Sequence, residues 1–240
     1  MKIILLDTET TSIDGHLIQL AYRLYSDQTM EGEFQSLYKP PEPISFGAMA
    51  INHITNEMVE KLLPFEGHEK ARLQGLLNDH IMVAHNAAFD VGILEKEGVT
   101  AGQVICTYKV AYALFPELES HNLQYLRYAL GLNDAELDKV SAHDAMGDVM
   151  VLERLFAKCL AKMSKDRPIE QCLKMMIDMS GQPLLLRKLT FGKHKGQEFK
   201  DVPLDYLRWL KQTFGQKKEK PDDPNLVYTV QYHLSQKSSK

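Results

Sequence analysis

Apolar residues along this chain follow two different patterns, one of short continuous runs and one of recurrence every three or four positions. The short runs are rich in β-branched side chains and end in polar residues, as buried strands do. The runs that predict strands cover residues 2–6, 17–25, 81–84 and 104–106. The N-terminal strand and the strand at 81–84 are each followed directly by polar side chains, where ligands gather in α/β proteins.

Helical spacing predicts the segments that connect and follow these strands. The predicted helices cover 56–63, 66–78, Phe89 to a stop at Gly98, 107–114, Asn122 to a stop at Gly131, and 144–163. Between the second strand and the first helix, Lys39-Pro40-Pro41-Glu42-Pro43 marks a loop. Strands mixed with helices in this way predict an α/β layered domain.

The length of 240 residues, with 44% hydrophobic and 25% charged side chains, predicts one large domain with a full-sized core and a small appendage. We place the main domain at 1–164 and a linker or short helix at 165–182, where Gly181 and Pro183 mark the boundary. A separate C-terminal module then covers 183–240.

The charge is distributed unevenly over these parts. The whole chain carries a net charge of -4, but residues 1–182 hold 16 basic and 26 acidic side chains, a net charge of -10. Residues 183–240 hold 12 and 6, a net charge of +6. A basic segment can be a solvated surface or a site for an anionic polymer.

The three cysteines and the N-terminus indicate a protein of the reducing cytoplasm. Cys106, Cys159 and Cys172 form no CxxC pair and cannot all be paired, which argues against a disulfide scaffold or a cysteine zinc site. The apolar run Ile3–Leu6 is interrupted by Asp7 and is too short for a signal or membrane segment. We therefore expect no association with a membrane.

Acidic side chains and one histidine carry the candidate chemistry. Asp7 and Glu9 are two apart on a strand, so they point to the same side, about 6–7 Å apart. Asp90 follows the strand at 81–84, near its carboxyl end or in the first turn of the next helix. Asp148 lies in the last long helix, and His143 lies on the loop or first turn before it, because positions five apart on a helix point in different directions.

Each of these residues also has an ordinary structural interpretation, as a solvated strand end, a first-turn acid or a surface side chain. Only their combination indicates a site. Four carboxylates in one cleft repel each other unless cations neutralise them, and oxygen ligands favour Mg²⁺ or Mn²⁺ over zinc. Two such ions can promote hydrolysis of a phosphodiester, with the histidine as general base.

Three segments resemble, in order and spacing, the motifs of the DEDDh family of 3′-to-5′ exonucleases. They are Asp7-Thr8-Glu9-Thr10-Thr11, His85-Asn86-Ala87-Ala88-Phe89-Asp90 and His143-x-Ala145-x-x-Asp148. Further stretches, among them Leu189-Thr190-Phe191-Gly192-Lys193-His194-Lys195-Gly196, resemble a branch of that family that acts on DNA. The resemblance covers nearly the whole chain and implies an RNase H-like fold, in which helices flank a mixed β-sheet.

The resemblance also implies roles for single residues. Asp7, Glu9 and Asp148 would bind two Mg²⁺ ions, for which Mn²⁺ can substitute, Asp90 would complete the acidic cluster, and His143 would deprotonate the attacking water. The positions implied at the nucleic-acid site are Thr8, Thr10, Ile13, Asn86 and Phe89, with Ile13 as an apolar wedge against the terminal base. Two departures from the family pattern, Ser12 and Asn52-His53, lie where we expect contact with the terminal nucleotide rather than with the metals.

The C-terminal module offers a second expected contact with DNA. Lys193 and Lys195 would share a face if their segment is extended, and the flanking glycines would allow a DNA backbone to approach. The module's apolar residues would equally allow it to act only by packing on the main domain.

Two other functions remain open at the level of sequence. An RNA 3′ exonuclease resembling RNase T or oligoribonuclease would use the same metal chemistry, because no motif shows how the site treats a 2′-hydroxyl. A nucleic-acid-binding module without catalysis would retain the fold, but all five catalytic residue types are present. The primary expectation is a 3′-to-5′ exodeoxyribonuclease that releases nucleoside 5′-monophosphates.

Overall fold

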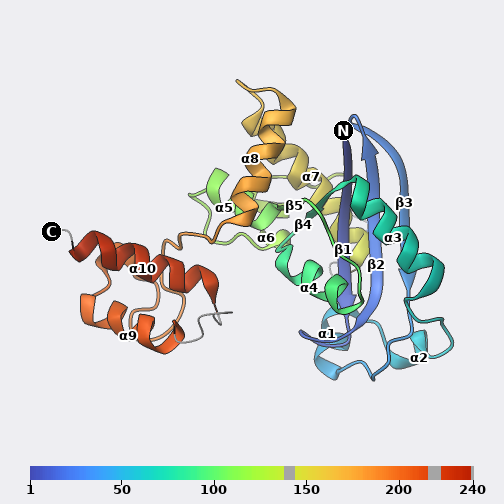
Figure 1. The fold of residues 1–240 in the computed structure, drawn as a ribbon, viewed down its shortest axis with the longest axis horizontal. Helices are drawn as coiled ribbons and strands as arrows, with labels where there is room; N and C mark the ends of the chain where they lie inside the picture. The colour runs from blue at the N-terminus through green and yellow to red at the C-terminus, as the bar shows by residue number, and fades with distance from the viewer. Residues whose placement is uncertain (138–143, 216–222, 239–240) are drawn as a thin grey trace. The chain divides into compact units, whose positions relative to one another are not determined.

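The computed structural model describes residues 1–137, 144–215 and 223–238, and the chain divides into two compact units, Met1–Gly181 and Gln182–Lys240 (Figure 1). The first unit is built on one five-stranded sheet. Its strands, in chain order, are β1 (Lys2–Thr10), β2 (Leu17–Ser26), β3 (Thr29–Leu37), β4 (Ile81–Ala84) and β5 (Val104–Cys106).

The sheet is mixed and has the strand order β3-β2-β1-β4-β5. β2 is antiparallel to both of its neighbours, β1 and β3, whereas β4 runs parallel to β1 and β5 parallel to β4. β1 therefore lies where the antiparallel half of the sheet meets the parallel half. In open α/β sheets, ligands bind beyond the carboxyl ends of the strands.

Helices cover both faces of this sheet, because β1 buries its side chains on both sides. Ile3 and Leu5 pack with α5 (Thr107–Leu114), α6 (Leu123–Ala129), α7 (Ala145–Met163) and α8 (Ile169–Gly181). Ile4 and Leu6 pack on the other side with α3 (Gly67–Asp79) and α4 (Ala88–Lys96). Two small helices, α1 (Phe46–Asn52) and α2 (Asn56–Val59), lie in the connection from β3 to α3. The predicted α/β class, with a mixed sheet flanked by helices, is confirmed.

The local predictions fail where burial is low. The sequence pattern predicts no strand at β3. All residues of this edge strand are exposed or only partly buried, so its sequence carries no continuous apolar run. The sequence pattern also predicts no helix at α1. The helix predicted over 56–63 ends at Val59, and Leu63, which contributed to the apolar pattern, is 82% exposed.

Residues 165–182, interpreted from the sequence as a linker or short helix, contain α8. Its buried Cys172, Leu173 and Met176 join the core around α7 and β5. In the described residues, no helix combines the length and apolar character needed to cross a membrane.

The second unit has a small core of its own. It contains the short 3₁₀ helix η2 (Phe199–Asp201), α9 (Leu204–Phe214) and α10 (Pro224–Ser238). Its buried apolar residues are Leu189, Phe199, Val202, Leu207, Leu210, Leu226 and Val230. The segment 191–196, which we expected to carry its two lysines on one face if extended, is a series of turns, so that condition is not met.

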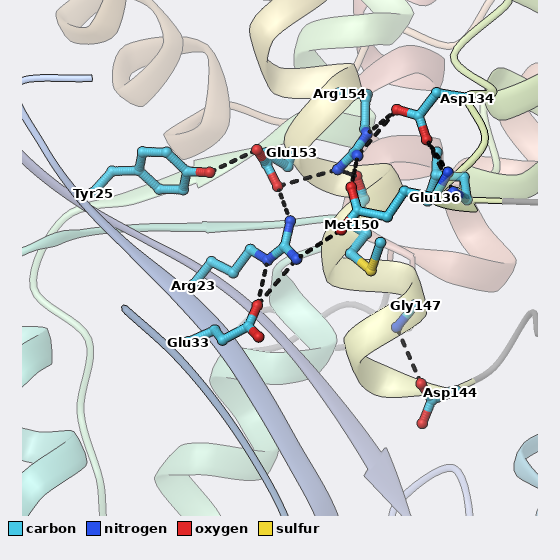
Figure 2. Close-up of polar contacts among 11 residues, drawn as sticks. Arg23, Tyr25, Glu33, Asp134, Glu136, Asp144, Gly147, Met150, Glu153 and Arg154 are labelled. Atoms are coloured by element: carbon cyan, nitrogen blue, oxygen red, sulfur yellow. Dashed lines mark hydrogen bonds and ion pairs between the residues drawn. The ribbon is translucent and has the colours of Figure 1, made fainter. Parts of the chain in front are cut away.

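A cluster of ion pairs joins α7 to the antiparallel half of the sheet (Figure 2). The Arg23 side chain on β2 is only 9% exposed and contacts Glu33 on β3, Glu136 and Glu153 on α7. Its Nη1 donates to Glu153 Oε2 at 2.5 Å, and the Tyr25 hydroxyl donates to Glu153 Oε1 at 2.6 Å. These interactions fix the long helix α7 against β2 and β3.

Replacing Arg23 by alanine should therefore destabilise the first unit. Removing a nearly buried guanidinium takes one charged donor from several carboxylates at once, so Arg23→Ala should lower the free energy of unfolding by about 2–4 kcal/mol. Arg72→Ala is a matched control, because Arg72 is exposed and lies over the Phe34 ring at 5.1 Å, an interaction worth about 1 kcal/mol or less. Urea unfolding measures both changes, and equal destabilisation would contradict this role of the cluster.

Candidate active site

The register of β1 sets where Asp7 and Glu9 lie. β2 pairs with β1 along its whole length, with Asp7 opposite Ala21 and Glu9 opposite Gln19. β4 pairs only with Ile3, Ile4 and Leu5. The two acids therefore lie on β1 beyond the part that β4 covers, on one face of the strand because side chains alternate. They are thus within the strand rather than after it.

α7 brings a third carboxylate to this pair. Asp148 lies in the first turn of α7 and is 7% exposed. One carboxylate oxygen from each of Asp7, Glu9 and Asp148 lies within 4.8 Å of the others. We refer to these three residues as the acidic triad.

The start of α7 is fixed by Asp144, which caps the helix by accepting a hydrogen bond from the Gly147 backbone at 3.2 Å (Figure 2). The side-chain amides of Gln19 and Gln35 donate to Asp144 Oδ1 at 3.2 and 2.8 Å. Gln19 Oε1 also accepts from the Ala145 backbone at 3.2 Å. β2 and β3 therefore set the position of the turn that carries Asp148.

A fourth acid, Asp90, lies in the first turn of α4 and is 2% exposed. The Thr8 hydroxyl donates to Asp90 Oδ1 at 2.8 Å. Thr8 lies between Asp7 and Glu9 on β1, and its side chain points to the opposite face of the sheet because side chains alternate along a strand. Thr8 thereby links the strand of the triad to Asp90.

Burial and mutual repulsion disfavour the charged forms of these acids. Burial, then the charges of Asp90, Asp148 and Glu9, raise the pKa of Asp7 well above its usual range. Burial and the charge of Asp148 raise the pKa of Glu9 to about 8. Burial raises the pKa of Asp90 to about 7, although the hydrogen bond from Thr8 opposes this shift. Buried carboxylates this close together need a cation to ionise together at neutral pH.

Neutral amides that the sequence did not reveal also contact the triad. Gln124 on α6 donates to Asp148 Oδ1 at 2.6 Å. The Asn52 side chain on α1 forms a hydrogen bond with Glu9 that lowers the pKa of that acid. Asn52, which the sequence places where we expect contact with the terminal nucleotide, thus also lies within hydrogen-bonding distance of an acid of the triad. Only tertiary packing brings these amides to the triad. The one indication in the sequence is that Asn52-His53 departs from the family pattern.

The other predicted site residues differ in their exposure to solvent. Ile13 is 81% exposed, in a turn that the Gly15 backbone closes by donating to Ser12 O at 2.9 Å. A Cβ on Gly15 would come within 2.1 Å of Thr11 Oγ1, so this turn requires glycine. Thr10 is buried and donates to Ser12 O at 2.7 Å.

The remaining predicted residues belong to the second motif, to the C-terminal unit or to the segment before α7. Asn86 is exposed and has a positive φ of 57°, and Phe89 packs partly into the core between the sheet and α4. Lys193 and Lys195 lie in the second unit. His143 lies outside the described residues.

Comparison with known proteins gives consistent matches. The RNase_T family, described as Exonuclease, matches residues 4–156. Exodeoxyribonuclease 10 of Escherichia coli (strain K12) is 30% identical over 213 residues, which cover 86% of this chain and 89% of that protein. DNA polymerase III subunit epsilon of Treponema pallidum (strain Nichols) is 29% identical over 175 residues, covering 66% and 76%.

Among solved structures, exonuclease X in complex with 5′-overhanging duplex DNA is similar with a TM-score of 0.62 and 27% identity, covering 75% of this chain and 99% of that one. The family match spans β1, β4, α4 and most of α7, the elements that carry the four acids. This chain therefore belongs to the RNase_T exonuclease family and is a 3′-to-5′ exonuclease similar to exodeoxyribonuclease 10 and exonuclease X.

Proposed function

We propose that the substrate is DNA and that the enzyme hydrolyses phosphodiester bonds at DNA 3′ ends, releasing nucleoside 5′-monophosphates by a two-metal mechanism. The observation that carries this proposal is the acidic triad, whose oxygens lie within 4.8 Å of one another on β1 and α7. DNA as the substrate is supported by the similarity to exodeoxyribonuclease 10 and to exonuclease X in its DNA complex.

The triad suits a hard divalent cation. Its ligand atoms are all carboxylate oxygens, which fit Mg²⁺, with Mn²⁺ as a substitute. Burial and then repulsion among the acids raise the pKa values of Asp7 and Glu9, and a divalent charge would offset both effects. When bound, two such ions would supply a reactive water and stabilise the leaving oxygen.

The protein's own residues hold and orient the reactants. Asp7, Glu9 and Asp148 hold the ions, and Asp90, held by Thr8, completes the acidic cluster. We assign His143 as the base that removes a proton from the attacking water. It directly precedes Asp144 in the sequence, and the capping interactions of Asp144 fix the chain where it enters α7.

The nucleotide contacts follow from positions around the triad. Ile13, exposed beyond the end of β1, would lie against the terminal base. Asn86 and Phe89 would border it from the segment that leads into α4. Because the hydroxyls of Thr8 and Thr10 bond within the protein, these residues would contact the nucleotide through their backbone.

Within the same proposal, residues 1–164 form the exonuclease domain, and the basic module 183–240 contacts the DNA backbone through Lys193 and Lys195. Both lysines are exposed. The module supplies the positive charge that the acidic exonuclease domain lacks.

Matched DNA and RNA oligonucleotides test the proposed substrate directly. With Mg²⁺, the enzyme should shorten the DNA strand from its 3′ end faster than the RNA strand, and EDTA should stop both reactions. Asp7→Ala and Asp148→Ala should each reduce cleavage more than about 100-fold, because a direct ligand matters at least as much as the groups that orient ligands. Asp79→Ala, an exposed carboxylate at the end of α3, is the control. Faster digestion of RNA would instead assign the enzyme to RNA processing.

The role of His143 predicts a particular pH dependence. Only a neutral imidazole accepts a proton, so the cleavage rate should rise with pH through the pKa of this histidine. His143→Ala should reduce the rate about 100-fold or more and should lack this rising limb. His68→Ala, which removes an exposed histidine, should retain both the rate and the limb. A His143→Ala enzyme with the wild-type profile would exclude the assigned role.

The raised pKa values predict how stability depends on pH without metal. Between pH 4.5 and about 8 the folded protein holds a proton on Glu9 that the unfolded chain releases, so in EDTA stability should fall as pH rises through this window. Excess Mg²⁺ should reverse the loss, by about 2.7 kcal/mol at 100 times its Kd.

Thermal unfolding with EDTA and with Mg²⁺ measures this effect. In EDTA, Glu9→Gln should flatten the pH dependence and raise the melting temperature at pH 8 above that of the wild type, because the amide carries no charge. Identical pH profiles for the two proteins in EDTA would argue against a destabilising charge at Glu9.

A further inference from the structure

The second unit carries an aromatic pair, half-buried Tyr206 and exposed Trp209, beside a basic turn. Tyr206 and Trp209 lie on α9 with their ring centroids 5.1 Å apart and their planes tilted by 40°. His194, from the turn at 192–195, meets the Tyr206 ring edge-on at 4.6 Å. Trp209 is 47% exposed, whereas Leu207 and Leu210 of the same helix are buried in the unit's core. Trp209 therefore lies outside the face that α9 uses for packing, whereas half-buried Tyr206 packs partly against the core of the unit.

We propose that Tyr206 and Trp209 form a platform on which unpaired bases of single-stranded DNA stack, while Lys193 and Lys195 hold the adjoining phosphates. This inference deepens the proposed function and rests on it, since it assigns a single strand of the substrate to a site separate from the acidic triad. Stacking on aromatic faces with cations along the backbone is a general mode of binding single strands, because every base has a face to offer.

Gly192 explains why the lysines lie beside the rings. It has a positive φ of 69°, and a Cβ at this position would come within 2.4 Å of the Tyr206 hydroxyl. Only glycine therefore allows the turn to close this tightly over Tyr206. The turn is completed by bonds from the Lys195 backbone to Gly192 O at 3.1 Å and from the Gly196 backbone to Leu189 O at 2.7 Å.

The charges around the platform favour a polyanion. Lys193 and Lys195 are exposed and form no ion pair with the described part of the chain, whereas Lys200 is already paired with Glu198 at 2.6 Å. α9 adds exposed Arg208 and Lys211 and contains a single carboxylate, Asp205. Residues 183–240 carry a net charge of +6. Cations alone would bind duplex and single strands alike, but exposed Trp209 and half-buried Tyr206 add an interaction that only unstacked bases can make.

Trp209 is the only tryptophan of the chain, so its fluorescence reports this site directly. The full-length protein in EDTA, which prevents digestion under the proposed mechanism, is titrated with oligothymidylate and with an abasic oligomer of the same length. Both carry the same phosphates, but only the first can stack. Oligothymidylate should quench Trp209, and the abasic oligomer should leave its emission nearly unchanged. Equal quenching by both, or none by either, would overturn the platform.

A binding measurement with variants provides the second test. Trp209→Ala should weaken oligothymidylate binding about fivefold or more, the lower range for losing one stacked base. Tyr228→Ala, which removes an exposed aromatic from α10, is the matched control and should bind normally. Equal affinities of the two variants for oligothymidylate would overturn the proposal, provided their melting temperatures match the wild type.

Charge reversal tests whether Lys193 and Lys195 hold the phosphates. Lys193→Glu with Lys195→Glu should weaken binding and flatten its salt dependence by about 0.7 in log-log slope for each phosphate that the variant no longer neutralises. An unchanged slope would remove the lysines from the site. Absence of DNA cleavage by the wild type would refute the proposed function, whereas absence of quenching alone would refute only this platform.

Discussion

The repulsion among buried carboxylates is the constraint on which the rest of this structure depends. Asp7, Glu9 and Asp148 approach within 4.8 Å, and burial with mutual repulsion raises the pKa of Glu9 to about 8. A fold that holds such groups together without a cation is destabilised at the site. The remainder of the first unit therefore has to supply the stability that this arrangement removes, through its two hydrophobic layers and the ion pairs of Arg23.

The scaffold supports the acids without neutralising them. The hydroxyl of Thr8 and the amides of Asn52 and Gln124 donate to Asp90, Glu9 and Asp148, so these hydrogen bonds orient the carboxylates but leave their charge in place. Arg23 instead pairs with Glu33 on β3 and Glu153 on α7. Uncompensated negative charge at the site is what a divalent cation requires, and the placement of neutral and charged donors is consistent with that requirement.

The two units carry opposite charge and suit different tasks. The first concentrates carboxylates, which favour metal ions but repel a phosphate backbone. The second concentrates lysines and, on α9, the rings of Tyr206 and Trp209, which in our proposal bind that backbone and its unpaired bases. A nuclease whose catalytic surface is acidic benefits from a separate basic surface that raises the local concentration of its substrate. The tight turn at Gly192 brings the segment of Lys193 and Lys195 close to the Tyr206 side chain.

The sequence by itself determined the features that depend on local periodicity. Apolar runs located β1, β2, β4 and β5, and strand alternation placed Asp7 and Glu9 on one face. Motif spacing then identified Asp90 and Asp148 as their partners. Only the tertiary structure decided what depends on contacts between distant elements: the approach of Asp148 to β1, the amides of Asn52 and Gln124, and the exposed edge strand β3. Periodicity reports which face of an element is buried, but strand register and helix packing determine which residues meet there.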